Sequence, residues 1–219
     1  MNSDFDTGLT DYLASFITEK RMERMRFVLG QRTRYLTIVL EDIYQPHNAS
    51  AVLRSCDGFG IQNVHVIENK NRFSPNKEVD MGTSQWLTIN RNNPKTGSSC
   101  TKETLSRLKK EGYRIVATTP HTQDTNLEDF SISRGKAAIV LGTELEGISG
   151  EVYDCADEYL KIPMHGFVES FNISVACALI LHHLSWKLRG SEITWQLSER
   201  ERETVLLDWL RKTVKNADS

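Results

Sequence analysis

The sequence of 219 residues contains few cysteines and no long hydrophobic run. The four cysteines form no Cys-x-x-Cys pair, so neither a zinc knuckle nor a disulfide framework is indicated; they are Cys56, Cys100, Cys155 and Cys177. No stretch of about 18 apolar residues occurs, and the acidic N-terminus lacks the basic start of a secretory signal. These absences predict a soluble, cytoplasmic protein with no membrane partner and no bound metal.

Charge is nearly balanced, since 27 Lys and Arg against 29 Asp and Glu leave a net charge of −2. This argues against a protein that coats nucleic acid by bulk charge, and DNA is not an expected partner. A local basic face remains open, because within 20–34 only Glu23 offsets six cations: Lys20, Arg21, Arg24, Arg26, Arg32 and Arg34. This run lies in a segment with helical spacing, 11–34. It is either a phosphate-binding surface or an ordinary solvated helix face.

Strand-like and helix-like segments alternate along the middle of the chain. The expected strands are 35–43, 63–68, 85–90, 113–119, 136–142 and 158–164, and the expected helices are 48–58, 101–111, 148–157 and 172–188. Asn48 and Asn172 are predicted helix caps, and Ser198 with Glu201 forms a capping box before a last helix. The fold class is therefore α/β, with a mainly parallel sheet and helices on both faces. A single domain, 35–190, is flanked by helical extensions, 1–34 and 191–219.

The usual phosphate cradles are missing, because no Gly-x-Gly-x-x-Gly follows the first strand and no Walker motif occurs. Three other groups of residues stand where a strand ends: Pro46-His47-Asn48 with Arg54, the glycine-bounded loop 141–147, and Ile162-Pro163-Met164 leading to 170–174. Each also has a purely structural interpretation. Arg54 can be an exposed helix arginine, the loop a simple turn, and Asn172 only a cap.

Together and in this order, the three groups resemble the motifs of the SpoU/TrmH family of SPOUT methyltransferases. The first is similar to Asn-x5-Arg (Asn48, Arg54), the second to Leu-Gly-x-Glu-x-x-Gly (141–147), and the third to Ile-Pro-Met followed by Ser-x-Asn (162–172). The resemblance covers almost the whole chain. It implies a C-terminal trefoil knot, a homodimer, and S-adenosylmethionine-dependent methylation of a ribose 2′-hydroxyl in tRNA, at guanosine 18 of the D-loop.

The resemblance also implies roles for individual residues. The catalytic group is Arg54, Asn48, Glu144, Ser170 and Asn172; the cofactor-binding group is Thr118, Gly142, Ile162 and Phe171; the RNA-binding group is Arg21, Arg24, Arg32 and His47. Phe171 stands where the family commonly has leucine, and an aromatic ring still supplies an apolar wall. A guanidinium does not lose its proton in proteins, so Arg54 is expected to act electrostatically rather than as a base.

The sequence leaves two alternative functions open and also bears on the assembly of the protein. In the first alternative, the protein is a related SpoU enzyme that methylates ribosomal RNA or another tRNA nucleotide. In the second, it is a catalytically silent member of the fold that only binds RNA. The apolar positions Leu206, Trp209 and Leu210, with the helix after Asn172, exceed what one small sheet covers. They favour the homodimer.

Overall fold

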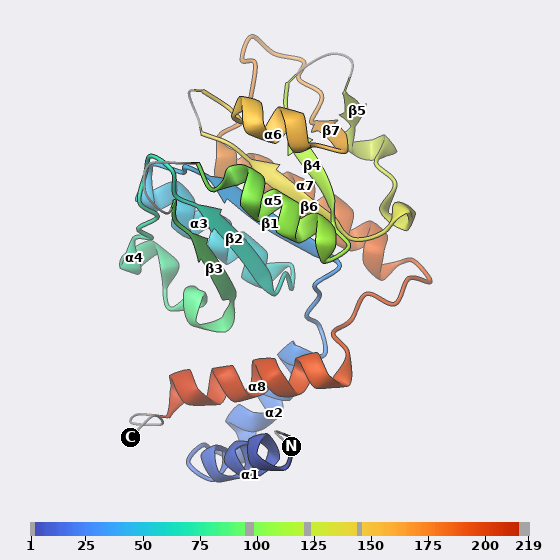
Figure 1. Cartoon of the computed structure of the whole chain (residues 1–219). Helices are drawn as coiled ribbons and strands as arrows, with labels where there is room; N and C mark the ends of the chain where they lie inside the picture. Colours follow the sequence, from blue (N-terminus) through green and yellow to red (C-terminus); the bar gives the residue numbers. More distant parts are fainter. Residues whose placement is uncertain (1–2, 95–98, 121–123, 144–145, 215–219) are drawn as a thin grey trace. The chain divides into compact units, whose positions relative to one another are not determined.

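The computed structural model describes residues 3–94, 99–120, 124–143 and 146–214. The chain forms two compact units (Figure 1). Two terminal segments, Met1–Thr33 and Gln196–Ser219, make the first, here called the helical unit, and Arg34–Trp195 makes the second, here called the α/β unit.

The α/β unit is built on one sheet of seven strands in the order β3-β2-β1-β6-β4-β7-β5. The strands are β1 (Leu36–Glu41), β2 (Asn63–Ile67), β3 (Thr88–Asn92), β4 (Arg114–Thr118), β5 (Thr125–Asn126), β6 (Ala137–Leu141) and β7 (Glu158–Lys161). Every pairing between these strands is parallel. The predicted α/β class with a parallel sheet is confirmed.

Helices cover both faces of this sheet, as predicted (Figure 1). On one face, α3 (Pro46–Gly58) and α7 (Ile173–Arg189) share a core with Ile38 and Leu40 of β1. On the other face, α5 (Thr101–Lys110) and α6 (Gly150–Cys155) share a core with Val39. All six residues of β1 are buried, which explains why the apolar residues Ile38, Val39 and Leu40 follow one another instead of alternating with polar ones.

Some short elements differ from the sequence-based prediction. The strand expected over 85–90 begins at Thr88, because η1 (Thr83–Trp86) forms a 3-10 turn and the parallel register with β2 starts at the pair Asn63 and Thr88. The loop after β2 contains the short helix α4 (Lys77–Asp80), which was not predicted. Nor were β5 and two further 3-10 turns, η2 (Leu127–Asp129) and η3 (Ile132–Arg134).

The helical unit contains α1 (Ser3–Ala14), α2 (Glu19–Leu29) and α8 (Glu199–Thr213). The single helical segment predicted over 11–34 is thus divided, and the Thr18 hydroxyl caps α2 by accepting the Arg21 amide at 3.3 Å. The capping box of Ser198 and Glu201 is confirmed. No helix within the described ranges has the length and apolar character needed to cross a bilayer.

The apolar face of α8 is covered inside this unit. Trp209 and Leu210 are 2% and 0% exposed, and α1 and α2 both pack on α8. The terminal helices of one chain therefore bury Trp209 and Leu210, whereas Leu206 is only half-buried, so the first two residues give no support to the homodimer.

Candidate active site

The three predicted motifs meet at the carboxyl edge of the sheet. The first motif follows β1, the second follows β6 and the third follows β7. β1 and β6 are neighbours, and only β4 separates β6 from β7. Because all these strands are parallel, their carboxyl ends share one edge, where open α/β sheets commonly bind ligands. This edge is the candidate active site.

The first and third motifs are in direct contact through two asparagines. Asn172 Nδ2 donates a hydrogen bond to Asn48 Oδ1 at 3.2 Å, and Asn48 Nδ2 donates to Gln45 Oε1 at 3.1 Å. Asn172 also caps α7, as predicted, because its Oδ1 accepts the Ser174 amide at 2.9 Å. Asn48 is not a helix cap, contrary to the prediction. Pro46, whose ring presets a helical φ, begins α3 two residues earlier.

Arg54 lies on the exposed face of α3, and its guanidinium is oriented by a neighbouring loop. Its Nη1 donates to the Val79 carbonyl at 3.3 Å. That carbonyl belongs to α4, whose first turn is held by Asn76, because the Asn76 Oδ1 accepts the amide of Glu78 at 2.8 Å. The Ser50 hydroxyl of α3 lies 3.1 Å from the Asn76 carbonyl and joins the two helices. The loop after β2 therefore positions Arg54.

The second motif forms a tight loop that depends on its two glycines. The amide of Thr143 donates to the Gly147 carbonyl at 2.8 Å, and the amide of Gly147 donates back to the Thr143 carbonyl at 3.0 Å. A Cβ on Gly142 would overlap the Gly147 carbonyl, and Gly147 has a φ of +69°. Only glycine fits both positions without strain. Glu144, predicted to be catalytic, lies outside the described residues.

Three of the predicted cofactor-binding residues stand at the ends of adjacent strands. Thr118 is the last residue of β4, Gly142 directly follows β6, and Ile162 directly follows β7. Phe171 is 40% exposed, and with the exposed Ser170 it directly precedes the Asn172 cap. The apolar side chains of Ile162 and Phe171 beside the Thr118 hydroxyl suit a cofactor that carries a nucleoside.

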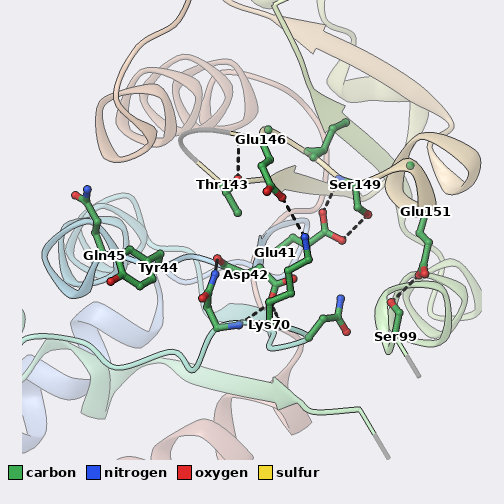
Figure 2. A pocket seen from close by; sticks show the side chains of 15 residues that line it. Glu41, Asp42, Tyr44, Gln45, Lys70, Ser99, Thr143, Glu146, Ser149 and Glu151 are labelled. Atoms are coloured by element: carbon green, nitrogen blue, oxygen red, sulfur yellow. Dashed lines mark hydrogen bonds and ion pairs between the residues drawn. The ribbon is translucent and has the colours of Figure 1, made fainter. Parts of the chain in front are cut away.

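A pocket of about 790 Å³ opens between the loops of the first and second motifs (Figure 2). Gln45, which directly precedes the first motif, and Thr143 of the second motif line it, together with the loop that follows β2. Glu41, at the end of β1, is 3% exposed and holds two walls of this pocket. It accepts the Thr101 hydroxyl at 2.8 Å, the Ser149 amide at 2.9 Å and the Ser149 hydroxyl at 2.7 Å. Its carboxylate is therefore structural.

The next residue, Asp42, holds the loop that carries Lys70. Asp42 has a φ of +53°, and its Oδ1 accepts the amides of Lys70 at 2.7 Å and Asn71 at 3.2 Å. The Lys70 backbone is thereby fixed, whereas its ammonium group reaches across the pocket to Glu146 Oε2 at 3.1 Å. Both side chains are largely exposed, at 70% and 73%. The hydrogen bond and charge of Glu146 raise the pKa of Lys70.

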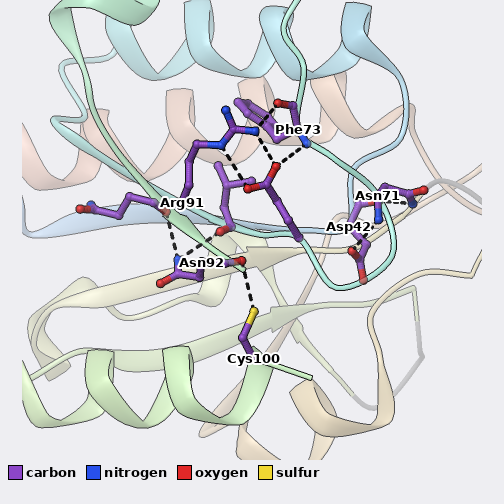
Figure 3. Close-up of polar contacts among 9 residues, drawn as sticks. Asp42, Asn71, Phe73, Arg91, Asn92 and Cys100 are labelled. Atoms are coloured by element: carbon purple, nitrogen blue, oxygen red, sulfur yellow. Dashed lines mark hydrogen bonds and ion pairs between the residues drawn. The ribbon is translucent and has the colours of Figure 1, made fainter. Parts of the chain in front are cut away.

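A second ion pair fixes the start of the same loop (Figure 3). Arg91 of β3 donates to both oxygens of Glu68, at 2.6 and 3.1 Å, and to the Phe73 carbonyl at 2.7 Å. Glu68 also accepts the Phe73 amide at 2.7 Å. Burial alone would raise the pKa of Glu68, but the bonds from Arg91 and Phe73 lower it below its usual value. Sequence reasoning assigned no role to these residues or to Glu41, Asp42 and Lys70, because their partners are distant in sequence.

The predicted RNA-binding residues separate into exposed and buried members. Arg21 and Arg24 are exposed on α2, and His47 is exposed in the first turn of α3. Arg32 is only 1% exposed, and its guanidinium lies over the Trp209 ring at 5.4 Å from the centroid. Arg32 is a core residue of the helical unit. Its predicted RNA contact is therefore withdrawn, since the guanidinium is packed on an aromatic face instead of facing solvent.

Comparisons with known proteins agree with this geometry. The family model described as the SpoU rRNA Methylase family matches residues 35–182. The tRNA (guanosine(18)-2'-O)-methyltransferase of Borreliella burgdorferi is 45% identical over 204 residues, which cover 93% of this chain and 90% of that protein. The 23S rRNA (guanosine-2'-O-)-methyltransferase RlmB of Coxiella burnetii is 32% identical over 158 residues, 70% of this chain and 59% of that protein.

Among solved structures, the A. aeolicus TrmH/SpoU tRNA modifying enzyme superimposes with a TM-score of 0.76 at 28% identity. The match covers 90% of this chain and 98% of that one. The region that matches the family model, 35–182, contains the sheet, α3, the second and third motifs and half of α7. It therefore includes every strand described above. The chain therefore belongs to the SpoU rRNA Methylase family.

Proposed function

We propose that this protein transfers a methyl group from S-adenosylmethionine to the ribose 2′-hydroxyl of a guanosine in tRNA, at position 18 of the D-loop. The observation that carries the proposal is the bond between Asn172 and Asn48, which joins the first and third motifs on the helix that bears Arg54. The 45% identity to a tRNA (guanosine(18)-2'-O)-methyltransferase over most of both chains supports the choice of substrate.

Arg54 acts in this mechanism through its charge. A guanidinium keeps its proton in proteins, so Arg54 stabilises the attacking oxygen and the adjacent phosphate, and the hydroxyl proton leaves to phosphate or water. Asn48, Ser170 and Asn172 orient the ribose, since in-line displacement depends mainly on positioning. Glu144 and His47 are supporting residues.

S-adenosylmethionine, when bound, supplies the methyl group as a sulfonium that loses its positive charge on transfer. Thr118, Gly142 and Ile162 would hold it at the ends of β4, β6 and β7, and Phe171 would supply an apolar wall. The tight turn that Gly142 permits keeps the second motif close to this edge.

RNA capture is assigned to the N-terminal helical extension, 1–34. Arg21 and Arg24 are exposed cations on α2 that can contact phosphates. The family resemblance further implies a trefoil knot in the domain 35–190, a cytoplasmic location and a homodimer. The exposed faces of Val175, Leu179 and Trp186 on α7, at 44%, 39% and 73%, support the homodimer. Light scattering is expected to give twice 25.0 kDa.

The decisive experiment supplies the purified protein with labelled S-adenosylmethionine and tRNA transcripts that carry either guanosine or 2′-O-methylguanosine at position 18. Methyl transfer to the first alone, mapped to that ribose, is the expected result. Transfer to 23S rRNA but not to tRNA would favour the ribosomal alternative. Binding of tRNA without binding of the cofactor would show a catalytically silent RNA-binding protein.

A further inference from the structure

The pocket between the loop after β1 and the second motif contains an exposed ion pair among its polar side chains. Its walls contain the acidic residues Glu41, Asp42 and Glu151, but each of these carboxylates accepts a hydrogen bond from the protein. Lys70 and Glu146 differ, because both side chains line the pocket, are mostly exposed and bond to each other at 3.1 Å (Figure 2). The pocket therefore presents an ammonium group beside a carboxylate.

The position of this pair suits contact with the nucleoside that carries the reacting ribose. Gln45 lines the same pocket and accepts a hydrogen bond from Asn48 of the first motif at 3.1 Å. Thr143, one residue after the predicted cofactor residue Gly142, lines its other side. A volume of about 790 Å³ exceeds what a single base requires. Tyr44, 71% exposed, adds an aromatic ring on which a base can stack.

The order of donors and acceptors selects among the four bases. An ammonium group only donates, whereas a carboxylate offers two acceptor oxygens. Along its Watson–Crick edge, guanine presents the acceptor O6, then the donors N1–H and N2–H₂, which complements this arrangement. Adenine and cytosine place an amino group opposite the ammonium, and uracil places its O2 opposite a carboxylate oxygen.

We propose that Lys70 and Glu146 read the target guanine, Lys70 donating to O6 and Glu146 accepting from N1–H and N2–H₂. The inference rests on the proposed function and names the residues that determine its base specificity. The ion pair opens when the base enters, at small cost, because exposed pairs are weak. The Lys70 backbone stays in place, because Asp42 accepts its amide and the Glu68–Arg91 pair fixes the preceding turn.

The test compares tRNA transcripts that carry guanosine, inosine or adenosine at the target position. Inosine lacks only the 2-amino group, so it loses one of the bonds to Glu146. The variant Glu146→Gln is expected to lower kcat/KM for guanosine by about 10- to 100-fold, the range for lost hydrogen bonds to a charged group. The same variant should lower kcat/KM for inosine by a smaller factor. Lys70→Met should lower the ratio of kcat/KM for guanosine to kcat/KM for adenosine by a similar factor.

A matched control is available in the ion pair of Lys102 and Asp154. Its atoms lie 3.6 Å apart, its side chains are 60% and 71% exposed, and neither residue lines the pocket. Asp154→Asn should leave all three kcat/KM values unchanged. Cofactor affinity, measured without tRNA, should be equal in all variants.

Three results would overturn the inference. Guanosine selectivity within twofold of wild type in both pocket variants would show an ordinary surface ion pair. An equal loss for all three bases would show a structural role. Failure of the wild-type protein to methylate any of the transcripts would refute the proposed function itself, and the inference with it.

Discussion

Acidification is expected to destabilise the α/β unit through His65, a buried histidine of β2. His65 is 4% exposed, and neither ring nitrogen has a hydrogen-bond partner among the described residues. Its side chain lies beside Arg107 of α5, at a polar cavity of about 600 Å³. Burial, and then the charge of Arg107, lower the pKa of His65 from 6.5 to about 4.

The sign and size of the effect follow from this shift. Above pH 6.5 the imidazole is neutral in the folded and the unfolded chain, so it contributes no pH dependence. Between 6.5 and 4 only the unfolded chain takes up the proton, and stability falls as the pH falls. A shift from 6.5 to about 4 corresponds to about 3 kcal/mol lost by pH 4, of which about 2 kcal/mol is lost by pH 5.

Urea unfolding of wild type and His65→Leu between pH 7 and 4.5 isolates this contribution, because other groups cancel in the difference. As the pH falls, the free energy of unfolding should decrease more steeply in wild type than in His65→Leu. The exposed His47 provides the control, and His47→Leu should retain the wild-type slope. A difference between wild type and His65→Leu that stays constant over this range would refute the reasoning, as would an NMR titration of folded His65 near 6.5.

Three further predictions concern the site. Arg54→Ala should lower turnover by about 10²-fold or more with unchanged cofactor affinity; near-normal methyl transfer would show that the catalytic role is wrong. Gly142→Ala should abolish cofactor binding, measured by calorimetry, because a Cβ overlaps the Gly147 carbonyl; full affinity would show that the loop tolerates a side chain. Replacing Arg21 and Arg24 by Ala should flatten the salt dependence of tRNA affinity by about one unit of slope per lost phosphate contact, whereas an unchanged slope would indicate a solvated face.

Local patterns predicted the sheet and several helix ends, because they depend on neighbouring residues. The apolar run of β1 and the capping box of Ser198 are examples, and the structure contains both. The predicted cap at Asn172 is also present. Asn48 was assigned wrongly because Pro46 begins the helix earlier, and one of its two hydrogen-bond partners described above, Asn172, lies 124 positions away.

Tertiary packing explains the other differences. A count of cations along 20–34 cannot distinguish Arg24, which is exposed, from Arg32, which packs on a tryptophan of the distant helix α8. Lys70 and Glu146 are separated by 76 positions, so no spacing rule would pair them. The three motifs, in their order along the sequence, predicted the region of the active site. The pocket between the loops could be found only from the structure.

The bonds of Glu41 also bear on the order in which the chain folds. This one side chain joins the start of α5, 60 positions away, to the cap of α6, 108 positions away. Contacts of such long separation form late, because the loops between them must close first. The pocket walls are therefore expected to assemble only after β1 has paired with β6.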